Sequence, residues 1–209
     1  MSGKKKLLTR RQRALRAGLS LAVLALLTFL IPLYHVFPGQ AVQAVGDWYG
    51  LAPLRTVLTA RLEEPSASGA DRLYLAENED ALVAALLEFR LLSGWDAALY
   101  EAVDCSGSDS PWCGLIRTYS LPYAYVFGRV DDPDVKEITF RAVYRPSLYS
   151  SLSQETVLTV DRASAKGVER DWYFLSPLPV STAFDDLLLC AVYWRADGGA
   201  ETLLWALGG

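Results

Sequence analysis

The feature that most constrains this chain is a stretch of 21 residues, from Ala17 to Phe37, that contains no Asp, Glu, Lys or Arg. At about 1.5 Å of rise per residue, a helix of this length covers roughly the 30 Å hydrocarbon core of a bilayer. The charged residues that precede it are all basic: Lys4, Lys5, Lys6, Arg10, Arg11, Arg13 and Arg16. Lys and Arg beside a span stay on the cytoplasmic side. The sequence therefore predicts a protein of the cell membrane with a cytoplasmic tail (1–16), a transmembrane helix (17–37) and an extracytoplasmic part after it.

A cleavable signal peptide is the alternative to a permanent anchor, since Val42-Gln43-Ala44 offers small residues to a signal peptidase. The apolar core of a signal peptide usually has about 7 to 15 residues. The apolar stretch here is longer, and it ends at Pro32 and the pair Tyr34-His35, which is typical of the membrane interface. Its length therefore favours the anchor.

The charge outside the predicted span limits the partners that this protein can have. Seven of the 20 basic residues precede the span, which leaves 13 basic against 24 acidic residues and a net charge of −11 for the rest. Nucleic-acid binding starts from a basic surface that replaces counterions along the phosphates. The sequence therefore predicts no nucleic-acid partner, and leaves the bilayer and an unidentified surface or membrane protein.

Alternation of apolar and polar residues dominates the part after the span and predicts a mainly β domain. Residues 38–53 are predicted to be a juxtamembrane connector, and 54–209 to form one domain. The predicted strands are 54–62, 72–76, 123–130, 136–144, 155–160, 171–175, 187–195 and 201–207, while 95–103 is either a strand or a helical turn. The strands 123–130 and 136–144 are expected to pair as a hairpin, and so are the last two. We expect an antiparallel β-sandwich or a curved sheet.

One helix is predicted near the start of this domain. Asn78 is a suitable N-cap, and apolar residues follow it at helical spacing, at Leu82, Ala85, Leu86 and Phe89. Ser93-Gly94 would end the helix, because glycine adopts the left-handed conformation that closes many helices.

The cysteines are informative because an extracytoplasmic location permits disulfides. Cys105 and Cys113 bracket a polar loop, and their spacing predicts a disulfide that would close it. Two unpaired thiols are the alternative in reducing surroundings. Cys190 lies in an apolar run and is predicted to be a buried core residue.

The residues available for catalysis are few. The single histidine, His35, ends the predicted span, so no Ser-His-Asp or Cys-His arrangement can form within the domain. Neither a cofactor-binding motif nor a metal-ligand spacing is present, and we predict no catalytic, cofactor-binding or metal-binding residue. The acidic cluster Asp131-Asp132-Pro133-Asp134 is typical of a turn.

A surface of aromatic residues is the binding site that the sequence leaves open. Trp112, inside the predicted disulfide loop, and Tyr119 are candidates for contact with sugar rings or with a partner protein. The alternative is that these rings fill the core between sheets.

The order of elements carries one resemblance. A basic tail, one span, a strand and a helix precede the segments YVFGRVDDPDVKEITF (125–140), WYFL (172–175) and CAVYWRADGGAETL (190–203). This order resembles uncharacterised single-pass, membrane-anchored extracytoplasmic β-domain proteins of Gram-positive bacteria. The resemblance implies a β-rich extracytoplasmic fold and no catalytic residue.

The sequence thus favours a non-enzymatic binding or accessory domain tethered at the outer face of the membrane. The alternative is a hydrolase of cell-wall polysaccharide that uses two carboxylates, since no other catalytic chemistry is visible.

Overall fold

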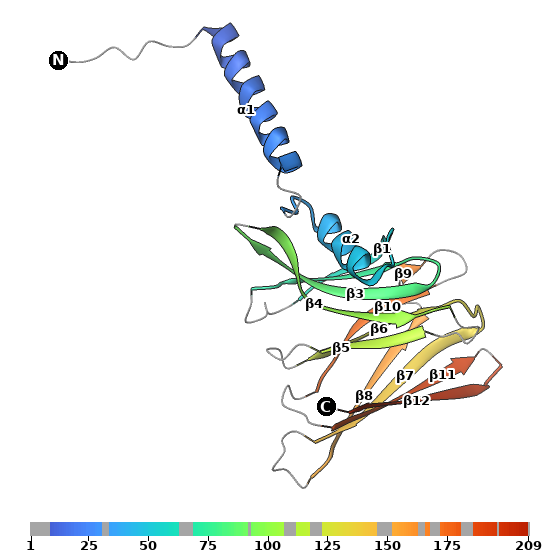
Figure 1. Cartoon of the computed structure of the whole chain (residues 1–209). Coiled ribbons are helices and arrows are strands. Elements are labelled where there is room, and N and C mark those ends of the chain that lie inside the picture. The colour runs from blue at the N-terminus through green and yellow to red at the C-terminus, as the bar shows by residue number, and fades with distance from the viewer. Residues whose placement is uncertain are drawn as a thin grey trace.

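The computed structural model describes residues 9–30, 34–62, 69–91, 93–106, 112–117, 123–145, 152–162, 166–167, 172–180, 186–195 and 197–208. Within these residues the chain forms two helices near its N-terminus, followed by three antiparallel sheets of four strands each. Figure 1 shows α1 projecting away from the β domain, with α2 lying between α1 and the first sheet. The prediction of a mainly β protein with antiparallel sheets is confirmed.

The first helix, α1, runs from Arg10 to Leu30 and begins seven residues before the predicted span. It begins there because Thr9 and Gln12 form a reciprocal cap: each side chain accepts a hydrogen bond from the backbone N–H of the other residue. Over the ranges given above, the structure contains no helix with both the length and the apolar character required to cross a bilayer. Residues 31–33 of the predicted span lie outside the described residues.

The second helix, α2, runs from Pro38 to Tyr49, where the sequence predicted a connector. Pro38 occupies the first helical turn, where its missing N–H costs nothing, and the Gln40 side chain accepts the backbone N–H of Phe37. Gly50 ends the helix in the left-handed conformation, with φ of 70°. The helix buries one face against the first sheet, through Ala41, Val42, Val45 and Gly46.

The strands of the first sheet are consecutive in the chain: β1 (Arg55–Arg61), β2 (Arg72–Glu77), β3 (Ala81–Arg90) and β4 (Gly94–Asp104). The second sheet has the order β5 (Trp112–Arg117), β6 (Ala124–Val130), β10 (Trp172–Leu178) and β9 (Lys166–Gly167). The third has the order β12 (Ala200–Gly208), β11 (Asp186–Arg195), β7 (Val135–Tyr144) and β8 (Gln154–Asp161).

These elements stack as layers (Figure 1). Three clusters of buried apolar side chains lie between the layers. One cluster lies between α2 and the first sheet and contains Val42 and Val83. The next lies between the first and second sheets and contains Leu75 and Phe127. The last lies between the second and third sheets and contains Phe140, with Trp172 and Phe174 among its other members. The second sheet is therefore covered on both faces.

The predicted helix after Asn78 is wrong, because these residues form strand β3. Its first eight residues, 81–88, are all buried, with alternate side chains facing α2 and the second sheet. A continuous apolar run of this kind fits a strand covered on both faces as well as it fits a helix. The Asn78 side-chain oxygen does accept backbone N–H groups, from Asp80 and Ala81, but it closes the turn between β2 and β3.

The predicted hairpin of 123–130 with 136–144 is also wrong. Strand β6 pairs with β5 and β10 in the second sheet, whereas β7 pairs with β11 and β8 in the third. The turn that joins β6 to β7 therefore carries the chain from one layer to the next. The predicted C-terminal hairpin is confirmed, since β11 and β12 pair in register around Asp197-Gly198-Gly199.

Candidate functional site

The candidate site begins with a buried carboxylate, Glu77, at the end of β2. Along this strand Leu73 and Leu75 face the second sheet, and strict alternation places Glu77 on the same face. The residue is only 6% exposed. Glu77 thus places a carboxylate on the face of β2 that is apolar at the two preceding positions of the alternation.

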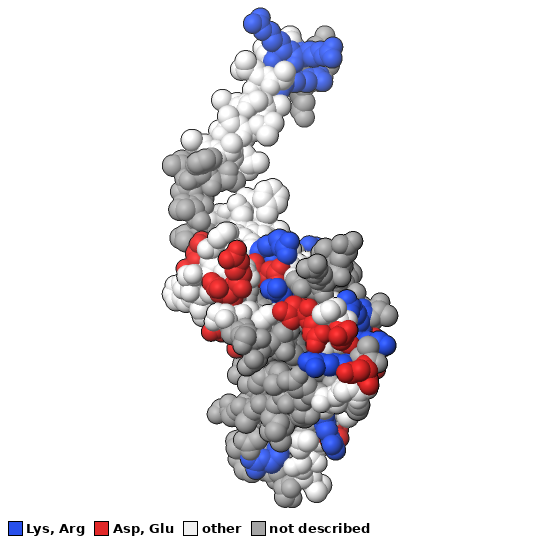
Figure 2. All heavy atoms as spheres, turned by 90° about the vertical axis from the view of Figure 1, so that its right-hand side faces the viewer, with Lys and Arg blue, Asp and Glu red and all other residues white. Residues whose placement is uncertain are grey.

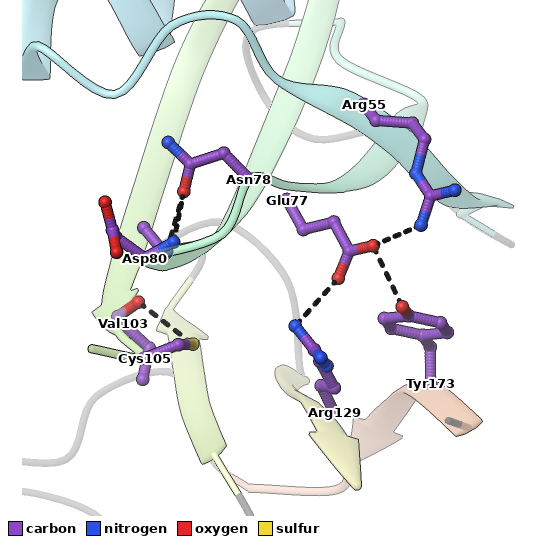
Figure 3. A network of polar contacts seen from close by, with 9 residues as sticks. Arg55, Glu77, Asn78, Asp80, Val103, Cys105, Arg129 and Tyr173 are labelled. Carbon is purple, nitrogen blue, oxygen red and sulfur yellow. Dashed lines mark hydrogen bonds and ion pairs between the residues drawn. The ribbon is translucent and has the colours of Figure 1, made fainter. Parts of the chain in front are cut away.

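Three side chains from three other strands converge on this carboxylate, as Figure 3 shows. The Tyr173 hydroxyl donates to Glu77 Oε1 at 2.9 Å, and Arg55 Nη2 lies 2.5 Å from the same oxygen. Arg129 Nη1 lies 3.5 Å from Oε2. The hydrogen bond to Glu77 raises the pKa of Arg55 above its ordinary value.

Strand register explains why these four residues meet. Arg55 is directly opposite Glu77 in the β1–β2 pairing, and Arg129 is directly opposite Tyr173 in the β6–β10 pairing. The site is therefore formed by two cross-strand pairs from different sheets that face each other. Removing one partner of such a buried charge pair is costly, because the remaining charge stays desolvated.

The Glu77 hollow lies beside this cluster and has a volume of about 680 Å³. It is lined by Pro53, Arg55, Glu77, Asn78, Glu79, Asp80 and Arg129. Three carboxylates and two guanidinium groups thus border one concave surface. Glu77 is already bound by donors from the protein, whereas Glu79 and Asp80 lie on an exposed turn. A ligand of this hollow would be polar and would meet both signs of charge.

Cys105 lies close to the hollow at the end of β4. Its backbone N–H donates to the carbonyl of Asp80 at 2.6 Å, and its thiol lies 3.5 Å from the carbonyl oxygen of Val103 (Figure 3). Burial raises the pKa of the Cys105 thiol to about 11, and the nearby positive charge of Arg129 opposes this effect. A thiol with a raised pKa is a poor nucleophile at neutral pH.

The disulfide predicted between Cys105 and Cys113 is not present in the structure, where each residue keeps its own thiol. Cys105 packs in the cluster between the first and second sheets, whereas Cys113 packs in the cluster between the second and third. The two side chains therefore occupy opposite faces of the second sheet. Proximity in sequence misled the prediction, because Cys113 belongs to a strand that the sequence did not reveal, β5. The side chain of Cys190 lies outside the described residues.

The two aromatic candidates have different outcomes. Trp112 is half-buried, packs against the cluster between the first and second sheets, and is covered by the guanidinium of Arg129 at 5.1 Å from the ring centroid. Its ring therefore contributes to packing next to the Glu77 cluster. Tyr119 lies outside the described residues.

The acidic residues before β7 form a turn that is held by contacts within the protein. The Asp132 side chain accepts the backbone N–H of Asp134 at 2.9 Å and pairs with Arg195 at 3.2 Å. In the described part of the chain, His, Cys, Asp and Glu side chains form no group of three that could hold a metal ion.

The Glu77 cluster is absent from the predictions above, although two signals in the sequence point to it. Glu77 closes the alternation of β2 on its apolar face, and Arg129 interrupts the otherwise apolar run 124–130. Two charges of opposite sign at interior positions of separate strands are expected to pair. Comparison of the chain with protein-family models, curated proteins and solved structures finds no match.

Proposed function

We propose that this protein is a single-pass, membrane-tethered extracytoplasmic domain that binds or supports a partner at the outer face of the membrane. The observation that carries this proposal is the surface of α1. Its large apolar side chains are exposed along the whole described length: Leu15, Leu19, Leu21, Val23, Leu24, Leu26 and Leu27. In the described structure, none of the three apolar clusters includes a residue of α1.

The distribution of charge supports the same proposal. Figure 2 shows basic residues gathered at the far end of α1, a shaft without charge, and acidic and basic residues mixed over the domain. The uncharged sequence continues from Ala17 beyond Leu30 to the non-helical residues 34–37. A helix over 17–33 would be about 25 Å long, at the lower end of what a bilayer core needs, with its basic end in the cytoplasm.

The Glu77 cluster supports a binding role over a catalytic one. Glu77 joins the first sheet to the second through Tyr173 and Arg129, so its position is fixed by the fold. General acid–base chemistry needs a carboxylate whose proton can move to or from a substrate. We therefore assign Glu77 to holding the two sheets together, and the hollow beside it to contact with a polar partner.

A carboxylate-based hydrolase of cell-wall polysaccharide is the second candidate, because Glu79 and Asp80 line the same hollow as Glu77. Two carboxylates that border one cavity are the minimum that such an enzyme needs. The test compares release of soluble sugar from purified cell wall by the wild-type protein and by the double variant Glu79→Gln, Asp80→Asn. Release that the variant loses would establish the hydrolase, and no release by either protein agrees with the binding role.

Protease treatment of intact cells, with a tag at each end of the chain, tests the tether. We expect full-length protein in the membrane fraction and digestion of the C-terminal part only. A shortened, soluble C-terminal part would mean that the N-terminal segment is cleaved. Protection of the C-terminal part would mean that the topology is inverted, and either result would contradict the proposal.

A further inference from the structure

The segment between the two helices is fixed to the tip of the β3–β4 hairpin. The backbone N–H of His35 donates to the carbonyl of Ser93 at 3.1 Å, and that of Trp95 donates to the carbonyl of His35 at 2.8 Å. The His35 ring nitrogen Nδ1 also lies 2.9 Å from the carbonyl oxygen of Trp95. Gly94 has φ of 76°, and any side chain there would collide with the His35 carbonyl. The hairpin tip therefore stays beside the chain that arrives from α1.

Large apolar side chains are exposed around this junction. Leu91 at the hairpin tip is 82% exposed, Phe89 on the same hairpin 54%, and Phe37 at the start of α2 67%. Trp48 is 81% exposed and, with His35, lines a hollow of about 210 Å³ between α2 and β4. We call Phe37, Trp48, Phe89 and Leu91 the apical patch. A soluble surface rarely gathers large apolar groups in this way unless they contact a partner or a membrane.

We propose that the apical patch lies in the headgroup region of the bilayer that α1 enters, so that the domain rests on the membrane surface. This inference rests on the proposed tether. Seven residues, 31–37, separate α1 from α2, and at 3.3 to 3.6 Å each they reach at most about 25 Å. The contacts of His35 with the hairpin shorten this reach further. The patch is thus held close to the end of α1 from which the chain would leave the bilayer.

The chemistry of the patch fits the membrane interface. Tryptophan is enriched at headgroup level because its ring combines a large apolar area with a polar N–H. The exposed phenylalanines and leucine of the patch add apolar area that insertion at the boundary with the acyl chains would bury. Arg90, between Phe89 and Leu91, has a side chain that is 58% exposed and pairs with Glu88 and Asp96. A guanidinium in this position can also contact lipid phosphate.

Contact of the apical patch with lipid would also orient the Glu77 hollow. In the β2–β3 pairing Glu77 is opposite Leu82, at the end of the first sheet away from the hairpin tip. Arg90 follows Leu82 by eight positions along β3, which corresponds to roughly 27 Å along the strand. The hollow would therefore remain in water and accessible to a partner while the patch contacts lipid.

The experiment uses the full chain reconstituted in phosphatidylcholine vesicles and two matched variants, Leu91→Cys and Leu152→Cys. Both leucines are highly exposed, at 82% and 75%, but Leu152 precedes β8 in the third sheet, the layer farthest from α2. Each variant is labelled with the polarity-sensitive fluorophore NBD, and wild-type protein treated in the same way gives the background from the native cysteines. We expect a blue-shifted emission and protection from aqueous dithionite for the label at position 91, and neither change at position 152.

A second variant avoids the label. Trp48→Phe is expected to reduce the fraction of tryptophan fluorescence that brominated lipids quench. Trp172→Phe removes a buried, unquenched ring and should leave that fraction the same or larger. Flotation of the vesicles separates the two possible failures. Protein that floats with the lipid but keeps position 91 and Trp48 in water overturns the docking and leaves the tether intact. Protein that does not float overturns both.

Discussion

The α1 helix and the β domain bury similar apolar side chains to opposite extents. The large apolar residues of α1 are between 47% and 73% exposed, whereas Phe127, Phe140 and Phe174 in the domain are at most 2% exposed. Each layer of the domain has an apolar neighbour within the chain, and α1 has none among the described clusters. Because burial of apolar surface is the main favourable term in folding, the difference supports the proposal that α1 is buried in a bilayer.

The largest effect is expected from charge on α1. The double variant Leu26→Lys, Leu27→Lys places two lysines near the centre of the predicted span. Each costs about 2.5 to 3.5 kcal/mol of insertion free energy at the centre of a spanning helix. We expect the protein to move from the membrane fraction to the soluble fraction, with an unchanged melting temperature of the domain. The control Leu26→Ala, Leu27→Ala should stay in the membrane. A lysine variant that stays there too would contradict the proposed burial of α1 in the bilayer.

The opposite effect is expected from Phe174→Ala, because this ring is buried between the second and third sheets and contacts Phe140, with ring centroids 5.5 Å apart. Truncating a buried phenylalanine costs about 3 to 5 kcal/mol. We expect a loss of this size in urea denaturation and no change in membrane association. Val157→Ala, at a site that is 55% exposed, is the control and should change stability little. A Phe174→Ala variant as stable as this control would show that the third sheet does not pack as described.

Buried and exposed ion pairs should also differ in their contribution to stability, and Glu77→Gln tests this difference. Arg129 would lose the negative charge that it faces across the two sheets, while the amide oxygen could still accept from Tyr173. Hydrogen bonds to charged groups contribute about 1.5 to 3 kcal/mol, so we expect a loss in this range in urea denaturation. Glu155→Gln is the control, because Glu155 and Arg141 form an exposed ion pair on the third sheet, and exposed pairs contribute little to stability. Equal effects of the two variants would mean that the Glu77 cluster does not join the sheets.

The smallest effect is expected from Cys105 at alkaline pH. Its folded pKa, about 11, lies above the ordinary value of 9.0 because the thiol is buried. Above pH 9 the unfolded chain loses this proton and the folded protein keeps it, so stability falls as the pH rises from 9 to 11. The decrease due to this group is roughly 2 kcal/mol. Urea denaturation across this range should show a shallower fall for Cys105→Ala than for wild type, and parallel curves would place the thiol in water.

Most strands were predictable because alternation records which face of a sheet is buried. The predicted strand 136–144, for example, corresponds to β7, which runs from Val135 to Tyr144. The helix predicted at 78–94 failed because the run 81–88 is buried on both faces and shows no alternation. The local features that predicted the ends of a helix are present, but they close turns between strands. The Asn78 oxygen accepts backbone N–H groups, and Gly94 has a positive φ.

The candidate site was less predictable than the fold, because it depends on which strands become neighbours in space. Glu77 and Tyr173 are 96 residues apart in the chain. No local pattern determines that β2 faces β10, so their contact needs the stacking order of the sheets. The predicted disulfide failed for the same reason, since the face on which Cys113 lies is set by the pairing of β5 with β6. The assignment of residues 38–53 to a connector overlooked Pro38 and Gly50, which are typical of the two ends of a helix.

The most direct test of the tether is alkaline carbonate extraction of membranes from cells that express the full chain with a C-terminal tag. Carbonate releases proteins held only by surface contacts and leaves those with a spanning helix in the pellet. We predict full-length protein in the pellet for the wild type and in the supernatant for the variant Leu26→Lys, Leu27→Lys. Complete release of full-length wild-type protein would contradict the tether and would require another partner for the exposed surface of α1.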